Sequence, residues 1–125
     1  MDHETAEDFY RRYMERCNAH RFDELDEFVH QDVRINDEPA GLDQYAAGLR
    51  AMVAPFVDYR WQVLELLVDG DRLAARFNDT GVLRDGRKLE TQEFAVYHLD
   101  DGKIAEVRGV WVKADTSVLN QLDDA

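Results

Sequence analysis

Three Asp-Gly pairs divide the second half of the chain into segments of similar length. They are Asp69-Gly70, Asp85-Gly86 and Asp101-Gly102. Asp-Gly favours type I′ hairpin turns, because both central residues of such a turn need a positive φ angle. The segments around these pairs change from helical periodicity to the period of two that is typical of strands. This pattern predicts a four-stranded antiparallel meander. The predicted strands cover residues 59–68, 73–83, 88–99 and 103–113.

The first half of the chain has apolar residues at every third or fourth position, which is typical of amphipathic helices. The predicted helices cover residues 5–19, 22–28 and 41–54. Thr5 with Asp8 resembles a capping box, and Pro55 ends the third helix. A short strand-like run, residues 29–35, precedes that helix. Helices followed by a meander predict a single α+β domain, in which three helices pack on one face of an antiparallel sheet.

The charge balance narrows the range of partners. The chain has 15 basic and 27 acidic residues, for a formal net charge of −12. Such a surface repels phosphate backbones and anionic lipids, so neither nucleic acid nor membrane is an expected partner. The N-terminal residues lack the basic and apolar regions of a secretory signal, and no apolar run is long enough to span a bilayer. These features predict a cytoplasmic location.

The sequence contains no motif that indicates a metal or a cofactor. The histidines, at positions 3, 20, 30 and 98, do not have metal-ligand spacing. There is no Gly-rich phosphate loop, Gly-x-Ser-x-Gly elbow or Cys-x-x-Cys pair. Cys17 is the only cysteine and falls on the apolar face of the first predicted helix, where a lone cysteine is usually a small core residue. We therefore expect neither a metal nor a cofactor.

The stretch 33–41 contains the first candidates for chemistry. A short apolar strand runs into Asn36, Asp37 and Glu38, and Pro39 follows. One interpretation is an ordinary turn, because turns favour Asn, Asp and Pro. The other places these residues at the mouth of a cavity between the helices and the sheet. The local sequence leaves both interpretations open.

Several polar residues interrupt the apolar pattern of the strands. Arg76 and Asn78 share one face of their strand, and Glu93 shares a face of the next strand with Ala95. These residues fit a face that is solvated or covered in a dimer, which antiparallel sheets allow. They also fit a curved inner face that keeps polar groups for a substrate. In that case Arg76 and Glu93 would form an internal ion pair, because a buried charge is costly unless it is paired.

The order and lengths of these elements resemble the NTF2-like cone fold, and within it the SnoaL-like polyketide cyclases. The stretches that carry this resemblance cover most of the chain. They are residues 29–33, 36–37, 41–45, 70–76 and 101–106, with Trp111, Asp115, Leu119 and residues 121–122. The resemblance implies a cone-shaped cavity between three helices and a curved antiparallel sheet. It also implies a homodimer that covers outward-facing apolar residues of the sheet, either Phe94 and Val96 or Val110 and Val112.

A more distant resemblance, to ketosteroid isomerase in the same superfamily, concerns the pocket. The matching residues are Arg12-Tyr13, Asn18-Ala19, Asp23, Asp32 and Asp37. This resemblance implies that Tyr13 donates to an oxyanion, that Asp37 is a general base and that Trp111 lines the pocket. The isomerase's second oxyanion-hole group, a protonated aspartate, corresponds to Ala95 here, with Glu93 two positions earlier. The chain therefore departs from the isomerase at this position.

The SnoaL-like resemblance implies a cofactor-free enzyme that binds an apolar, carbonyl-bearing small molecule and transfers protons with carboxylates. Asp115 best matches the acid/base aspartate of these cyclases, although Asp there also suits an N-cap. Asp37 is its rival as a base, and Tyr13 or a protonated Glu93 would stabilise an enolate. Asn36 and Trp111, together with Arg76 and Asn78, are the candidate substrate contacts.

The type of reaction and the class of function remain open at this point. Aldol cyclisation, isomerisation and dehydration all begin with the same proton abstraction. A non-catalytic small-molecule binding or accessory protein is an alternative, because a fold alone does not determine function. A purely dimeric interaction module is a third reading, and it predicts a filled cone.

Overall fold

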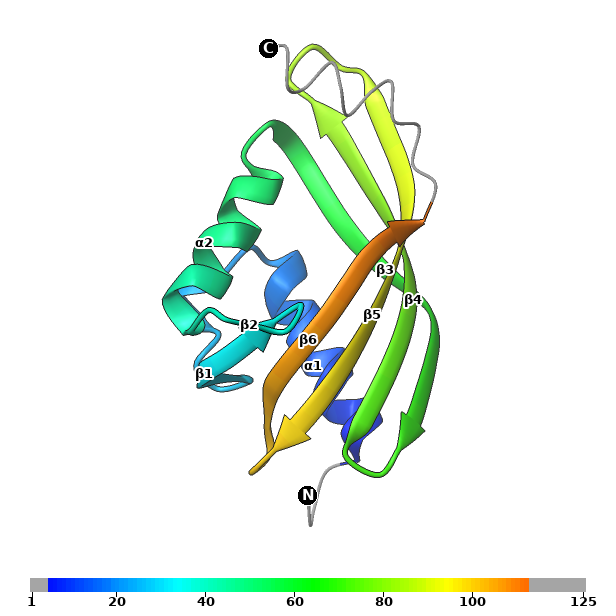
Figure 1. The fold of residues 1–125 in the computed structure, drawn as a ribbon. Coiled ribbons are helices and arrows are strands. Elements are labelled where there is room, and N and C mark those ends of the chain that lie inside the picture. The colour runs from blue at the N-terminus through cyan, green and yellow to red at the C-terminus, as the bar shows by residue number, and fades with distance from the viewer. Residues whose placement is uncertain (1–4, 113–125) are drawn as a thin grey trace.

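The computed structural model describes the backbone of residues 5–112 and the side chains of residues 5–109. Its helices are α1 (Ala6–Asn18), the single 3₁₀ turn η1 (Phe22–Glu24) and α2 (Leu42–Val53). Its strands are β1 (Val29–Ile35), β2 (Glu38–Pro39), β3 (Phe56–Asp69), β4 (Arg72–Leu83), β5 (Lys88–Asp100) and β6 (Lys103–Val112). Both α-helices lie on the same side of a curved sheet (Figure 1).

The strands form one six-stranded sheet in the order β2-β1-β6-β5-β4-β3. Strands β3 to β6 make the predicted antiparallel meander. The prediction of a wholly antiparallel sheet was wrong, because β1 runs parallel to β6, with Arg34 opposite Glu106 and Ile35 opposite Val107. A parallel pair needs a long connection, and here α2 and the meander supply it. The first and last described strands therefore lie side by side.

The structure has two α-helices and one short 3₁₀ turn instead of the three predicted helices. The predicted helix over residues 22–28 is reduced to η1, and the Leu25 carbonyl accepts hydrogen bonds from the amides of Phe28 and Val29. Seven residues are too few for an isolated helix to be stable without help from packing. The apolar residues Phe22, Leu25 and Phe28 are all buried, so a compact turn satisfies the same apolar pattern.

Helix α1 begins as its sequence predicts. The Thr5 hydroxyl accepts a hydrogen bond of 3.0 Å from the Asp8 amide and so caps the first turn. The apolar face of α1 is buried against the sheet. Its buried residues are Phe9, Tyr10, Tyr13, Met14 and Cys17. Within residues 5–112, neither α-helix has the length and apolarity to cross a membrane.

The hairpin turns follow the Asp-Gly pattern only in part. Asp101 and Gly102 have φ angles of 54° and 78°, as a type I′ turn requires. The β4–β5 hairpin instead has a longer loop, residues 84–87, in which the Asp85 carboxylate accepts from the Arg87 amide at 3.1 Å. A two-residue turn joins β1 to the short strand β2, which was not predicted, and its residues Asn36 and Asp37 have φ angles of 49° and 71°. The backbone of these two residues is therefore a turn, as one of the two interpretations expected.

Candidate active site

A cavity of about 280 Å³ lies between α2, the end of β1, and strands β5 and β6. Its lining combines apolar side chains with three polar ones. The lining residues are Ile35, Asn36, Tyr45, Gly48, Leu49, Met52, Glu93, Val107 and Gly109. An apolar cavity with a few convergent polar groups is the usual form of a small-molecule site.

Glu93 is the acidic residue of this lining, and β5 directs it inward. Alternate residues of a strand face the same side, and Thr91, Ala95 and Tyr97 on the inner face of β5 are buried. The Oε1 atom of Glu93 is itself buried. Desolvation makes a carboxylate a stronger base, because it penalises the charged form. The cavity thus brings a carboxylate and an apolar wall together.

Tyr45 supplies the phenol of the cavity, and Tyr13 supports it from α1. The hydroxyls of Tyr13 and Tyr45 are hydrogen-bonded to each other. Burial is the main cause that raises the pKa of Tyr45 above its ordinary value, and the negative charge of Glu93 raises it further. The Tyr45 phenol therefore stays neutral at ordinary pH and keeps a proton to donate. Tyr13, the predicted oxyanion donor, does not line the cavity but bonds to the tyrosine that does.

Asn36 is held at the cavity by the last described strand. Its side-chain oxygen accepts a hydrogen bond of 3.1 Å from the Gly109 amide. Its own amide donates to the Val107 carbonyl at 2.9 Å. The two-residue turn and these contacts hold Asn36 against the wall of the cavity. Asn36 is therefore both a turn residue and a cavity residue.

Asp37 points away from the cavity. Its carboxylate accepts from the Nε of Arg108 at 2.9 Å, and this side chain is 68% exposed. The bond to Asp37 is the main cause that raises the pKa of Arg108. The role of Asp37 as a base was conditional on a dry cavity, and this condition does not hold at an exposed ion pair.

Arg76 and Asn78 lie on the outer face of the sheet. Arg76 bonds to Glu65 at 2.7 Å, and Asn78 bonds to Glu90 at 3.0 Å. The predicted internal pair of Arg76 with Glu93 was wrong, because Arg76 lies opposite Phe94 and so faces away from Glu93. A shift of one residue in register exchanges the two faces of a strand. In the β4–β5 hairpin Val82 lies opposite Lys88, one residue out of register with a turn centred on Asp85-Gly86, which would place Arg84 opposite Arg87.

The structure describes the two remaining candidates only in part. The backbone of Trp111 pairs with Glu93 across β5 and β6, which places both residues on one face of the sheet. The side chain of Trp111 and the whole of Asp115 lie outside the described residues. Their predicted roles stay predictions.

One interior carboxylate, Asp79, was not among the candidates predicted from the sequence. Asp79 is completely buried, and its Oδ2 accepts a hydrogen bond of 2.7 Å from the Tyr59 hydroxyl. The signal was present, because Asp79 shares a strand face with the apolar residues Leu73, Ala75 and Phe77. A carboxylate on the apolar face of a strand indicates a buried charge that must be compensated.

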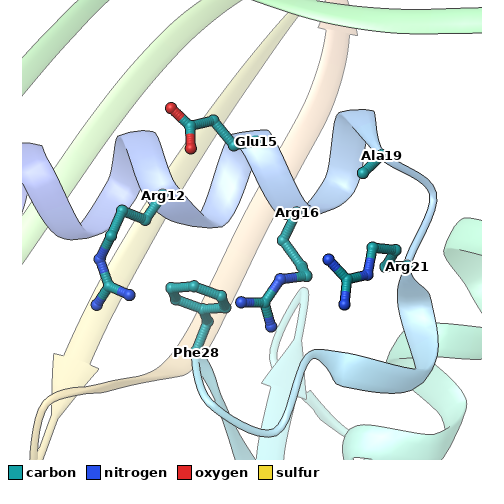
Figure 2. A pocket seen from close by; sticks show the side chains of 6 residues that line it. All are labelled: Arg12, Glu15, Arg16, Ala19, Arg21 and Phe28. Carbon is teal, nitrogen blue, oxygen red and sulfur yellow. The ribbon is translucent and has the colours of Figure 1, made fainter.

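A second hollow, of about 220 Å³, is lined mainly by charged side chains of α1. Figure 2 shows Arg12 and Arg16 on the same side of α1 as the ring of Phe28. Their guanidinium carbons lie 5.2 and 4.8 Å from the ring centre. Glu27 accepts from Arg12 at 2.6 Å and from Arg16 at 3.1 Å, and these bonds lower the pKa of Glu27. This network ties α1 to the segment before β1.

Cys17 lies in the core beside these elements. Burial raises the pKa of its thiol to about 12, so the reactive thiolate is scarce at neutral pH. Among the described residues, no three His, Cys, Asp or Glu side chains are grouped to hold a metal ion.

Comparisons with known proteins agree with this architecture. The SnoaL-like domain family matches residues 10–107. A SnoaL-like polyketide cyclase from Agrobacterium tumefaciens strain C58 superposes with a TM-score of 0.83 at 30% sequence identity, over 95% of this chain and 98% of the other. No curated protein sequence matches the chain.

Two further structures, both under 25% identical, support the fold alone. IdmH from Streptomyces antibioticus has a TM-score of 0.81 at 19% identity, over 96% of this chain and 99% of its own. An NTF2-like protein of unknown function from Exiguobacterium sp. 255-15 has a TM-score of 0.72 at 21% identity, over 84% of this chain and 98% of its own. Together with the domain match, these findings confirm the resemblance drawn from the sequence: the chain has the NTF2-like fold and belongs to the SnoaL-like domain family.

Proposed function

We propose that the chain is an acid/base enzyme that needs no cofactor and acts on an apolar, carbonyl-bearing small molecule. Glu93 transfers the proton, and Tyr45 donates a hydrogen bond to the oxygen that becomes negative. The observation that carries this proposal is the presence of both groups on the wall of one largely apolar cavity. The match to a SnoaL-like polyketide cyclase supports the reaction class.

The proposed chemistry begins at a carbon next to the substrate carbonyl. The Glu93 carboxylate takes a proton from this carbon, and the electron pair of the C–H bond moves into the enolate. The enolate oxygen then accepts a hydrogen bond from Tyr45, which Tyr13 supports from behind. A preorganised donor of this kind typically contributes about 3 kcal/mol to lowering the barrier. Return of the proton to another carbon gives isomerisation, and attack of the enolate on a second carbonyl gives cyclisation.

Deuterium exchange tests this first step without knowledge of the natural substrate. β-Tetralone is a compact apolar ketone with exchangeable protons next to its carbonyl. In deuterium oxide, the wild-type protein should accelerate deuterium incorporation, and Glu93→Gln should reduce this acceleration about 100-fold or more. Asp37→Asn and Asp115→Asn test the two rival carboxylates. The proposal fails if either rival substitution abolishes exchange while Glu93→Gln retains it.

The same assay separates the enzyme from a non-catalytic binding protein. A binding or accessory protein would take up β-tetralone in the cavity without accelerating exchange. That result, observed by mass spectrometry alongside a binding isotherm, would replace the enzymatic proposal with the binding one.

We also propose that the protein forms a homodimer through the outer face of the sheet. This face exposes several large apolar side chains on β3 and β5. They are Leu67, Phe94 and Val96. Contiguous apolar surface on a protein with a net charge of −12 is typical of an interaction site. The ion pair of Arg76 with Glu65 lies on the same face and would contribute polar contacts to that interface.

A further inference from the structure

We propose that Asp79 and Glu93 form a coupled carboxylate pair inside the cone, in which Asp79 stays ionised and Glu93 holds the exchangeable proton. The inference rests on the proposed function, because it explains how Glu93 becomes a base suited to neutral pH. Asp79 is a positioning residue in this scheme: it acts through Glu93 and does not itself line the cavity.

The Tyr59 hydroxyl stabilises the charged form of Asp79. Asp79 is completely buried on the inner face of β4. Its Oδ2 accepts from the Tyr59 hydroxyl at 2.7 Å. A hydrogen bond donated to a carboxylate stabilises the anion and lowers its pKa. The phenol remains a donor, because burial first, and then the negative charge of Asp79, raise the pKa of Tyr59.

The strand register places Glu93 beside Asp79. Asp79 lies opposite Thr91 in the β4–β5 ladder, and Glu93 is two residues further along on the same face of β5. Such diagonal neighbours have Cβ atoms about 7 Å apart, within reach of long side chains. The charges of Asp79 and Glu93 both raise the pKa of Tyr59, so both carboxylates act on one phenol.

Two carboxylates in one dry site do not ionise independently, because each negative charge disfavours the other. Tyr59 donates directly to Asp79, so the charge stays there. When the pair takes up one proton, that proton resides on Glu93, whose Oε1 is buried. The groups around Glu93 that titrate belong to several elements. Among the described residues they include Tyr10 from α1, Tyr45 from α2, Tyr59 from β3, Asp79 from β4 and Tyr97 from β5.

The coupling to Asp79 suits Glu93 to its proposed role as a general base. A general base is most effective when its pKa lies near the working pH. The fixed charge of Asp79 would raise the pKa of Glu93 toward the working pH. The reacting form is the pair with both carboxylates ionised. When Glu93 takes the substrate proton, the pair falls from two negative charges to one, and the enolate oxygen near Tyr45 carries the other charge. When Glu93 returns the proton, the pair regains its second charge and the cycle closes without a net change.

A carbon-13 NMR titration of the Asp and Glu carboxyl groups tests the pair directly. Glu93→Gln identifies the Glu93 resonance. In the wild-type protein this carboxyl should titrate about two pH units above an ordinary glutamate. Asp79→Asn should lower the Glu93 pKa by about one unit or more, since it removes the neighbouring charge and keeps the shape. Thr91→Val, the matched control opposite Asp79, should leave the Glu93 titration unchanged.

A second variant keeps the test decisive if Asp79→Asn does not fold. Tyr59→Phe removes the donor to Asp79, so part of the shared proton should move to Asp79 and the Glu93 pKa should fall. An ordinary Glu93 pKa in the wild-type protein, or an unchanged one in either variant, overturns the pair.

The two proposals fail separately. If Glu93→Gln abolishes deuterium exchange while the Glu93 titration is independent of Asp79, Glu93 is the base and the pair is refuted. If the Glu93 titration shifts with Asp79 while Glu93→Gln retains exchange, the pair stands and the enzymatic role of Glu93 is refuted.

Discussion

The hydroxyl of Tyr13 is hydrogen-bonded to the hydroxyl of Tyr45, so a residue of α1 orients a residue of the cavity wall. Both side chains are buried, at 2% and 8% exposure. The sequence resemblance attributed the oxyanion donor to Tyr13. The structure instead places Tyr45 at the cavity and Tyr13 one hydrogen bond behind it. Replacing Tyr45 with Phe should therefore affect ligand binding differently from replacing Tyr13 with Phe.

We predict that Tyr45→Phe weakens the binding of β-naphthol, a planar phenol whose anion resembles an enolate, by about tenfold. One hydrogen bond to a ligand contributes up to about 1.4 kcal/mol, which corresponds to a factor of ten. Tyr13→Phe should weaken binding about threefold or less, since the Tyr45 hydroxyl remains in the wall. Fluorescence titration measures both constants. An equal or larger loss for Tyr13→Phe would show that Tyr13 itself contacts the ligand.

A second prediction concerns Gly48, which lies within α2 and lines the cavity. A Cβ atom at this position meets no other atom within 4 Å, so the cavity has room for a side chain here. Gly48→Leu should abolish β-naphthol binding by filling that room. It should also stabilise the protein by about 0.5–1 kcal/mol, because glycine is a poor helix former.

Gly48→Ala is the matched control for this prediction. It should give a similar gain in stability, measured by urea denaturation, while β-naphthol still binds. Loss of stability in both variants would contradict the open space at Gly48. Undiminished binding in Gly48→Leu would show that the ligand site lies elsewhere.

A third prediction concerns alkaline pH. All the tyrosines of the chain are buried, and burial is the main cause that raises the pKa of Tyr10, Tyr13, Tyr45, Tyr59 and Tyr97. The pKa of Cys17 rises likewise, from 9.0 to about 12. Above pH 9 the unfolded chain therefore binds fewer protons than the folded protein. Stability is complete below that pH and falls as the pH rises.

Parallel absorbance and circular dichroism titrations test whether stability falls as the pH rises. Tyrosinate absorbance should stay flat past the ordinary tyrosine range and then rise together with the loss of native ellipticity. A rise near the ordinary tyrosine pKa in a protein with native ellipticity would show that at least one tyrosine is accessible to solvent.

A fourth prediction tests the outer face of the sheet. The wild-type protein should sediment as a dimer at micromolar concentration, and Val96→Lys should shift it to monomer, because a charge at an apolar interface is costly to desolvate. Ala51→Glu, on the exposed side of α2, is the control and should remain dimeric. A monomeric wild-type protein at these concentrations would refute the proposed dimer.

Local signals in the sequence were sufficient for most of the fold. Turn residues marked the limits of β3 to β6, and the Thr5 cap marked the start of α1. The parallel pairing of β1 with β6 could not be predicted in this way, because it depends on how the intervening chain packs. The apolar pattern of residues 22–28 does not distinguish a short helix from a compact turn, because both bury the same side chains.

The candidate site was harder to predict for two physical reasons. Asn36 and Asp37 are neighbours in the sequence, but a turn directs Asn36 to the cavity and Asp37 to Arg108 at the surface. Arg76 and Glu93 have compatible charges, but the register of β4 with β5 puts them on opposite faces. Glu93 was recognised as a candidate because it interrupts an apolar strand. Tyr45 was counted only as part of an apolar helical stripe, since periodicity does not reveal a hydrogen bond.

The pairing of β1 with β6 also bears on when the site can exist during synthesis. One part of the cavity wall comes from residues 35–52 and the other from residues 93–109. A ribosome therefore makes the first part about 40 residues, or several seconds, before the start of the second. Until β6 emerges, Asn36 lacks its partners on β6, and the apolar residues on α2 have no opposing wall. The cavity can thus form only after β6 has been synthesised, and no shorter nascent chain can bind the ligand.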